Sequence, residues 1–316
     1  MIDSRLSELY EAYRKEHAFA GKPDSLYESM QYIMDLGGKR IRPLLVLMAA
    51  ESAGGSAKEA LPLAHVVEIF HNFSLVHDDI MDQALVRRGK PTVHQRWNTP
   101  TAILAGDNML VMAFEVWNRY QGLNKSELFD AFAQTAKAVC EGQQKDMDFA
   151  EQAQVDIADY LEMIEQKTAV LLGCALQMGA LTAGVDHELA ELYYQLGCSV
   201  GLSFQMIDDH LDSFGTQAQT GKRLGGDIAE GKKTWLYLRS AQISQEVHRL
   251  FAEKEDEDRI QAVRALWVKQ GLDTGLLELA ESYHQKAQAQ LSALQEKGCD
   301  VQALNDLCDW LLARQH

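Results

Sequence analysis

Apolar residues recur at intervals of three and four along much of the chain, the spacing that places side chains on one face of an α-helix. Two such stripes lie near its middle: Leu161, Ile164, Thr168 and Leu171, followed by Leu189, Leu192, Leu196 and Val200. Runs of alternating β-branched residues, which would indicate strands, are missing. The hydrophobic pattern therefore predicts an all-α protein.

Glycines and prolines divide this pattern into segments. All five prolines lie at or before residue 100, so the rest of the chain can form long helices without a proline break. Helix ends are expected near glycines, at residues 21–23, 37–38, 54–55, 88–91, 122, 184, 215–226 and 271. Because no linker, tandem repeat or low-complexity tract separates these segments, residues 1–316 are expected to form a single domain.

Two aspartate clusters of the form D-D-x-x-D are the strongest chemical signal. They comprise Asp78, Asp79, Asp82, Asp208, Asp209 and Asp212. Residues four apart share a helix face, so the first and last of each cluster project together and repel unless a cation lies between them. Hard oxygen ligands favour Mg²⁺, which usually completes its shell with phosphate oxygens. One such cluster is more often a solvated helix face, but two beside basic residues predict a phosphorylated substrate.

The overall composition limits the possible partners. A formal net charge of −16 disfavours nucleic acid. Five cysteines without a C-x-x-C motif indicate neither a disulfide framework nor a zinc site, so a reduced cytoplasmic protein is expected. The N-terminus lacks a signal-peptide core, and no apolar run is long enough to form a transmembrane segment.

Basic residues gather in glycine-containing segments around the acidic clusters. In G-G-K-R-I-R-P, Lys39 and Arg42 stand where a helix begins, and the free N–H groups there also favour an anion. Arg87 and Arg88 follow the first cluster and can point to opposite sides of a loop, so that each serves a different phosphate. Pairing of Arg87 with Asp82 is the structural alternative. After the second cluster, G-K-R-L-G-G-D and G-K-K-T supply lysines that can close over a phosphate.

Taken in order, these motifs resemble the trans-isoprenyl diphosphate synthases of the polyprenyl synthetase family. The resemblance covers residues 36–237 and comprises G-G-K-R-I-R-P, H-D-D-I-M-D, R-R-G-K-P-T-V-H, K-T, F-Q-M-I-D-D-H-L-D, G-K-R-L-G-G-D and G-K-K-T. It implies a helical bundle around a deep central cavity, usually in a homodimer, with about three Mg²⁺ ions held between the clusters. It also implies head-to-tail condensation of isopentenyl diphosphate with dimethylallyl, geranyl or farnesyl diphosphate.

The resemblance further implies roles for individual residues. Direct metal ligands would be Asp78, Asp82 and Asp208, supported by Asp79, Asp209 and Asp212. The allylic diphosphate would be held by Arg87, Lys167, Lys222 and Lys232, and isopentenyl diphosphate by Lys39, Arg42, His71 and Arg88. Thr168 and Gln205 would present oxygens to the reacting carbon. Alone, a histidine such as His71 is more often a core residue, and Thr168 and Gln205 would be ordinary helix residues.

Residues just before the first cluster are expected to set product length. Phe73 and Ser74 precede Asp78 by five and four positions, about one helical turn deeper in the cavity. Phe73 would block a long chain, Ser74 leaves room, and Phe70 could add a second barrier. With no two-residue insertion in the first cluster, the resemblance implies a C15 to C20 product, geranylgeranyl diphosphate being slightly favoured. The structural alternative is that Phe73 simply belongs to the core.

Two other protein classes share part of this pattern. A class I terpene cyclase would also be all-α with an aspartate cluster and Mg²⁺, but it requires no second diphosphate site. A non-catalytic subunit of a heteromeric prenyl synthase would usually have degraded aspartate motifs, whereas both are intact here. The basic residues assigned to isopentenyl diphosphate therefore favour the condensing enzyme.

Overall fold

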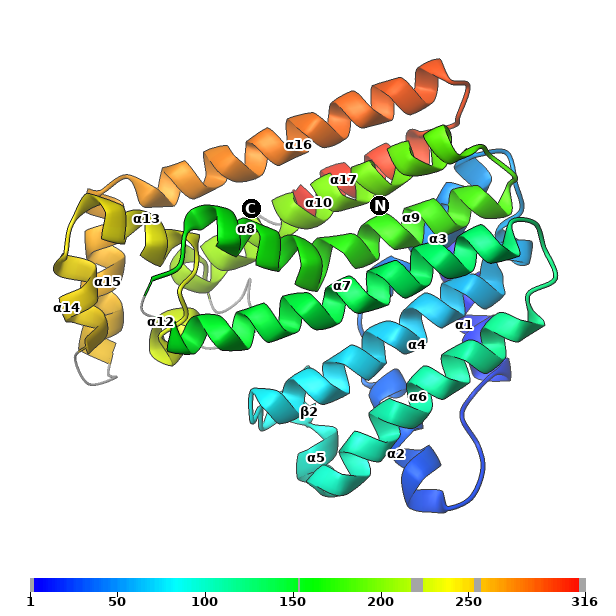
Figure 1. Cartoon of the computed structure of the whole chain (residues 1–316), viewed down its shortest axis with the longest axis horizontal. Helices are drawn as coiled ribbons and strands as arrows, with labels where there is room; N and C mark the ends of the chain where they lie inside the picture. Colours follow the sequence, from blue (N-terminus) through cyan, green and yellow to red (C-terminus); the bar gives the residue numbers. More distant parts are fainter. Residues whose placement is uncertain (1–2, 153, 217–223, 253–256, 313–316) are drawn as a thin grey trace.

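The computed structural model describes residues 3–152, 154–216, 224–252 and 257–312. Helices form nearly all of its regular structure, which confirms the all-α prediction. Long helices run side by side along the molecule, and short helices gather at one end (Figure 1). Within the described ranges, none of the helices combines the length and apolar character needed to span a membrane. That the whole chain is one domain stays a prediction.

The helices follow the expected divisions of the chain. The first half contains α1 (Ser4–Glu16), α2 (Asp24–Asp35), α3 (Ile41–Ser52), α4 (Ala57–Met81), α5 (Val93–Arg96), α6 (Thr99–Arg119) and α7 (Lys125–Glu151). The second half contains α8 (Ile157–Ile164), the π-helical turn η1 (Glu165–Ala169), α9 (Val170–Thr182), α10 (His187–Phe214), α12 (Gly226–Glu230), α13 (Trp235–Ile243), α14 (Glu246–Ala252), α15 (Glu257–Lys269), α16 (Leu272–Glu296) and α17 (Gln302–Leu312). The glycine segments expected to end helices lie at these boundaries where they are described.

Helix α9 forms the centre of the larger core. It is apolar on almost every side, as expected of a helix surrounded by others, and α3, α7 and α10 pack against it. Its contact with α10 is close because two glycines meet there: a Cβ on Gly197 would lie 2.5 Å from the Cα of Gly173. A second core joins the C-terminal part of α10 to α13–α16.

A small hairpin follows α4, although no strand was predicted there. Strands β1 (Val86–Arg87) and β2 (Lys90–Pro91) pair antiparallel. The connecting residues Arg88 and Gly89 both have positive φ, 52° and 72°, as in the type I′ turn that suits a two-residue hairpin. Arg87 ends a strand and Arg88 begins the turn, so the two side chains leave the backbone from different conformations.

The expected regular helical stripe from Leu161 to Leu171 was wrong in one respect. Residues Glu165–Ala169 form a π-helical turn, in which the backbone N–H of Val170 donates to the carbonyl of Glu165. A π turn uses i→i+5 hydrogen bonds, so it breaks the 3.6-residue period on which the stripe was based. The interruption lies at Lys167 and Thr168, two of the predicted site residues.

Candidate active site

The first aspartate cluster lies at the C-terminal end of α4. Asp79 is only 1% exposed, and each of its carboxylate oxygens accepts a hydrogen bond from Arg87 Nε at 2.9 Å. Arg87 Nη2 lies 3.4 Å from Asp78 Oδ2. The partners of Arg87 are therefore Asp78 and Asp79, and the alternative that named Asp82 was wrong. Partial burial and the charge of Asp78 raise the pKa of Asp82, which caps the helix.

The second cluster lies near the end of α10 and is held by different partners. Buried Asp209 accepts hydrogen bonds from the Tyr160 hydroxyl and from Gln205 Nε2, the latter at 2.9 Å. Asp212 accepts one from the backbone N–H of Asp227 at 3.0 Å. Burial, together with the charge of Asp227, raises the pKa of Asp209 well above its usual range. Asp209 therefore accepts hydrogen bonds from neutral donors, whereas Asp79 of the first cluster is paired with the cation Arg87.

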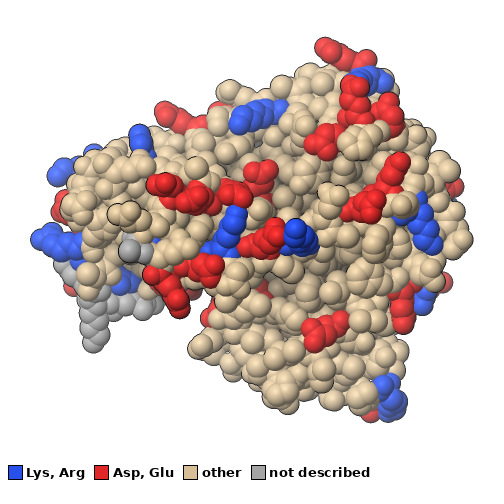
Figure 2. Space-filling view, viewed as in Figure 1, with Lys and Arg blue, Asp and Glu red and all other residues tan. Residues whose placement is uncertain are grey.

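The two clusters line one cavity of about 490 Å³, here called the acidic cavity. The first cluster contributes Asp82, and the second contributes Asp208, Asp209 and Asp212. Lys232 also lines it and lies 2.9 Å from Glu230. Lys222, the other lysine predicted to bind phosphate here, lies outside the described residues. Figure 2 shows patches of acidic side chains, with basic side chains between them, on the face that it draws.

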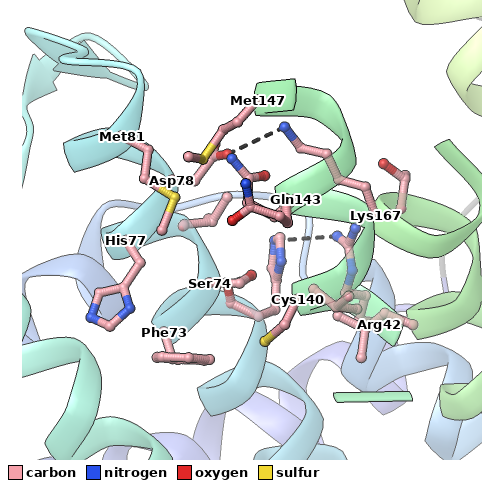
Figure 3. Close-up of a pocket in the computed structure, with 16 residues that line it drawn as sticks. Arg42, Phe73, Ser74, His77, Asp78, Met81, Cys140, Gln143, Met147 and Lys167 are labelled. Atoms are coloured by element: carbon pink, nitrogen blue, oxygen red, sulfur yellow. Dashed lines mark hydrogen bonds and ion pairs between the residues drawn. The ribbon is translucent and has the colours of Figure 1, made fainter. Parts of the chain in front are cut away.

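The π turn places Lys167 and Thr168 between the acidic cavity and a second, apolar cavity. Lys167 Nζ lies 2.5 Å from Asp146 and 3.4 Å from Asp78, and Figure 3 shows it reaching toward Asp78. Burial alone would lower the pKa of Lys167, but the charges of Asp78 and Asp146 outweigh it and raise the pKa. Thr168 Oγ1 donates a long hydrogen bond of 3.5 Å to Gln205 Oε1.

The adjoining apolar cavity has a volume of about 380 Å³. It shares Met81, Met147, Lys167 and Thr168 with the acidic cavity, so the two meet at the π turn. Phe73 and Ser74 line it, and Figure 3 shows both below Asp78.

Phe70 lies behind this wall. Its ring is 1% exposed and 5.4 Å from that of Phe73, centroid to centroid, and it does not line the cavity.

A group of basic residues, here called the basic region, comprises Lys39, Arg42, His71 and Arg88, and two of them line the apolar cavity. Arg42 Nη1 lies 3.2 Å from His71 Nε2, and both side chains line the cavity. Burial lowers the pKa of Arg42 to about 10, and burial and the charge of Arg42 lower the pKa of His71 well below its usual value. Arg88 donates to the carbonyl of Gly37, while Lys39 Nζ lies 4.2 Å above the Trp310 ring of α17.

Glycine conformations shape the turn that holds this basic region. Gly37 and Gly38 have φ values of 82° and 119°, which residues with a side chain rarely adopt. A Cβ on Gly38 would also lie 2.9 Å from the Arg88 guanidinium. Arg40, the middle cation of G-G-K-R-I-R-P, turns inward and donates to Glu68 at 2.6 Å. The three cations of this motif therefore have three different environments.

Sequence reasoning missed several residues that contact the predicted ones. Asp146 pairs with Lys167, Tyr160 donates to Asp209, and Gln143 lies in the apolar cavity with an unbonded buried Nε2. Asp146 and Gln143 are on α7, whose sequence carries no cluster or glycine-rich segment of the kind that revealed the other elements. Only their closeness in space to Lys167 and Asp78 identifies them.

The carboxylates fit Mg²⁺ by their chemistry. Asp78 Oδ1 is buried without a hydrogen bond, although Lys167 lies nearby. In the described part of the chain, no group of three His, Cys, Asp or Glu side chains is placed to hold an ion by itself. That arrangement suits Mg²⁺, which is usually bound by one or two carboxylates together with water and substrate phosphates.

Comparisons with known proteins agree with this geometry. A sequence profile described as polyprenyl synthetase matches residues 23–267. The chain is 37% identical over 300 residues to a geranylgeranyl diphosphate synthase of Methanosarcina mazei, covering 93% of this chain and 91% of the relative. It matches a crystal structure of a geranylgeranyl pyrophosphate synthase with a TM-score of 0.93 and 43% identity, over 98% and 97% of the chains. A polyprenyl synthase from Caulobacter crescentus, complexed with calcium and isoprenyl diphosphate, matches with a TM-score of 0.87 and 29% identity, over 99% and 97%.

Proposed function

Because the chain belongs to the polyprenyl synthetase family, we propose that it joins isopentenyl diphosphate head to tail to an allylic diphosphate in a Mg²⁺-dependent reaction. The product is a short all-trans prenyl diphosphate of C15 to C20, with geranylgeranyl diphosphate favoured. One observation carries this proposal: the cavity lined by members of both aspartate clusters adjoins an apolar cavity that also contains Arg42 beside His71. This arrangement offers two differently charged places for two diphosphates around one apolar space.

The acidic cavity is the proposed site of the allylic diphosphate. Asp78, Asp82 and Asp208 would hold Mg²⁺, and Asp79, Asp209 and Asp212 would support them, because their carboxylates already accept hydrogen bonds. When bound, Mg²⁺ supplies positive charge that offsets the charge of the leaving diphosphate. Arg87, Lys167 and Lys232 add fixed positive charge at the same place. The polyprenyl synthase of Caulobacter crescentus that is complexed with calcium and isoprenyl diphosphate supports a divalent cation in this family.

The basic region is the proposed site of isopentenyl diphosphate. The guanidinium groups of Arg42 and Arg88 can each donate two hydrogen bonds to a phosphate, and Lys39 can add a third positive charge. His71 is held neutral beside Arg42, so it can donate a hydrogen bond without adding a charge. Arg42 and His71 lie side by side in the apolar cavity, and a diphosphate bound there would offset the charge of the guanidinium.

The proposed reaction breaks the bond between C1 of the allylic substrate and its diphosphate oxygen. Thr168 and Gln205, which both line the acidic cavity, would present oxygens to this point and stabilise the positive charge that develops on carbon. The double bond of isopentenyl diphosphate then attacks C1 through its C4, and C2 loses a proton to the released diphosphate. Leu171 and Phe73 help to exclude water that would otherwise capture the cation.

A second copy of the chain is the proposed partner. Helix α6 exposes the apolar side chains Ile103, Leu104, Val111 and Phe114, and Phe129 of α7 lies beside Phe114. An exposed apolar stripe of this kind is typical of an interface, and the family resemblance implies a homodimer. Sedimentation of the wild type and of Leu104→Asp tests this: a dimer that becomes a monomer supports the proposal, and a monomeric wild type contradicts it.

Product analysis tests the activity directly. Labelled isopentenyl diphosphate is incubated with dimethylallyl, geranyl or farnesyl diphosphate, with and without Mg²⁺. The expected result is a labelled C15 or C20 diphosphate that forms only with metal. Unchanged substrates would instead indicate a silent subunit, and a cyclic hydrocarbon formed from the allylic diphosphate alone would indicate a cyclase; either result would contradict the proposed function.

A further inference from the structure

The π turn η1 lies inside an otherwise continuous helical run from α8 to α9. Its third and fourth residues, Lys167 and Thr168, both line the junction between the acidic and apolar cavities. A π turn is less favourable than the α-helix that could replace it, so some neighbouring contact must favour the wider backbone. The two long helices on either side of η1, α7 and α10, provide such contacts.

On the α7 side, the backbone of the turn lies directly against Gly142. A Cβ built on Gly142 would lie 2.4 Å from the backbone N of Lys167 and 2.8 Å from the carbonyl carbon of Gln166. Both of these are backbone atoms, which cannot rotate away as the end of a flexible side chain can. Gly142 has an ordinary helical conformation, so close approach and not backbone freedom explains the glycine.

On the α10 side, Gly201 makes the matching contact. A Cβ there would lie 2.6 Å from Cα and 2.8 Å from Cβ of Ala169, the last residue of the turn. Gly201 is also within a regular helix. The turn is therefore held between two helices that each lack a side chain at the point where the wider backbone needs room.

We propose that Gly142 and Gly201 are positioning residues for the reaction: they accommodate η1 and so set Lys167 against Asp78 and Asp146. This inference rests on the proposed function, since it assigns Lys167 to the allylic diphosphate. A methyl group on Gly142 must push the backbone N of Lys167 outward to reach ordinary contact. The 2.5 Å and 3.4 Å contacts of Lys167 with Asp146 and Asp78 would then change.

A matched control is available on α9. A Cβ on Gly179 would lie 2.2 Å from the carbonyl oxygen of Val46, a backbone clash as severe as that at Gly142. Gly179 is ten residues beyond Ala169, about 15 Å along the helix axis. Gly179→Ala should therefore lower stability without moving the π turn.

The experiment compares Gly142→Ala, Gly201→Ala and Gly179→Ala with the wild type. We measure thermal unfolding, kcat, KM for isopentenyl diphosphate, and the Kd of a thiolo analogue of geranyl diphosphate. Gly142→Ala is expected to lower kcat by about 100-fold, because a displacement of about 1 Å in a positioned group has that effect. It should weaken analogue binding while leaving KM for isopentenyl diphosphate unchanged. Gly201→Ala should act in the same direction, and Gly179→Ala should change only the unfolding temperature.

A double-mutant cycle separates positioning from general destabilisation. If Gly142 acts through Lys167, the effect of Gly142→Ala should fall to about 3-fold or less in a Lys167→Ala background. Additive effects, or equal losses of kcat in Gly179→Ala and Gly142→Ala, would overturn the inference. If Gly142→Ala does not fold, Gly201→Ala and its own cycle with Lys167→Ala decide. A wild type without turnover would refute the proposed function alone, and the analogue affinities of the variants would still test the positioning role.

Discussion

The basic region and the acidic cavity carry opposite charges, yet burial affects them in corresponding ways. In the basic region, burial lowers the pKa of Arg42 to about 10 and lowers the pKa of His71. In the acidic cavity, burial and neighbouring carboxylates raise the pKa of Asp82 and Asp209. In both places burial is the main cause of the pKa shift, because it disfavours the charged form of the group, and nearby charges of the same sign add to it. Each region therefore favours a ligand of the opposite charge, a diphosphate in one and a cation in the other.

The two regions differ in how neighbouring side chains offset their charges when no ligand is bound. The first aspartate cluster has its own cations, Arg87 and Lys167. Arg42 has as its hydrogen-bonding partner a histidine held neutral, which relieves none of its charge. The comparison predicts that substitutions in the acidic cavity affect mainly the chemical step, and that substitutions in the basic region affect mainly one substrate's binding.

The largest expected effect is in the two aspartate clusters, where Asp78 lines the apolar cavity and Asp208 lines the acidic cavity. Asp78→Ala and Asp208→Ala should each lower kcat by about 10³-fold, because each removes charge stabilisation at the leaving diphosphate. Steady-state turnover across a Mg²⁺ titration measures this, and circular dichroism checks the fold. Exposed Asp148 on α7 lines neither cavity, so Asp148→Ala is the control and should remain active. Near-normal turnover in either cluster variant would contradict the metal assignment.

The next effect is in the basic region. Arg42→Gln should raise KM for isopentenyl diphosphate by about 30-fold, the value of a lost charged hydrogen bond of about 2 kcal/mol. KM for the allylic diphosphate should stay unchanged, since Arg42 does not line the acidic cavity. Initial rates with each substrate varied in turn measure both constants. Equal increases in the two KM values would erase the distinction between the regions.

A pH dependence distinguishes the regions in the protein without ligand. The pKa of folded His71 lies below the unfolded value of about 6.5, so the unfolded chain binds a proton that the folded protein excludes. Stability should therefore fall as the pH drops from 7 to 5, by about 2 kcal/mol from this residue.

Buried His65, whose pKa is lowered to about 3 by its burial, acts in the same direction. Urea unfolding of the wild type and of His71→Asn at both pH values measures the contribution of His71. The variant should lose less stability on acidification, and an identical loss would show that His71 is not the source.

The smallest effect on rate is expected in the apolar wall between the two regions. Phe73→Ala should lengthen the product by one or two isoprene units, because it removes the ring that lines the cavity, while kcat changes by about 3-fold or less. Chromatography of the dephosphorylated products measures chain length. Phe70→Ala as a single substitution should lengthen the product less than Phe73→Ala, since Phe70 lies behind Phe73. An unchanged distribution in Phe73→Ala would remove this residue as the barrier.

Local sequence signals predicted most of the fold. Glycines near residues 37, 54, 122, 184 and 271 mark helix ends in the structure, because each interrupts an apolar stripe and the chain must turn there. The two aspartate motifs indicated one shared site because both have the same spacing and both precede basic segments. The structure brings members of both to a single cavity.

Features that depend on close approach between helices could not be predicted in this way. The π turn at Lys167 is compatible with a regular helical pattern, and only Gly142 and Gly201 packed against it explain the wider backbone. Arg40 and Arg42 belong to one motif, yet one turns to Glu68 and the other to His71. The two side chains point in different directions because Arg40 has a left-handed backbone conformation, with φ of 50°. Helix propensity does not predict such a conformation.

The hairpin after α4 has a consequence for how such enzymes diversify. Arg87 reaches the aspartates of α4 while its neighbour Arg88 reaches Gly37, and Tyr32 of α2 holds the far strand through the carbonyl of Pro91. The turn that begins at Arg88, directly after strand residue Arg87, thus fixes the separation of the two arginines. A point mutation can reshape the wall at Phe73, but altering that separation would require inserting or deleting a residue. If Phe73 sets product length as proposed, selection can vary that length in single steps while the geometry of the condensation is inherited unchanged.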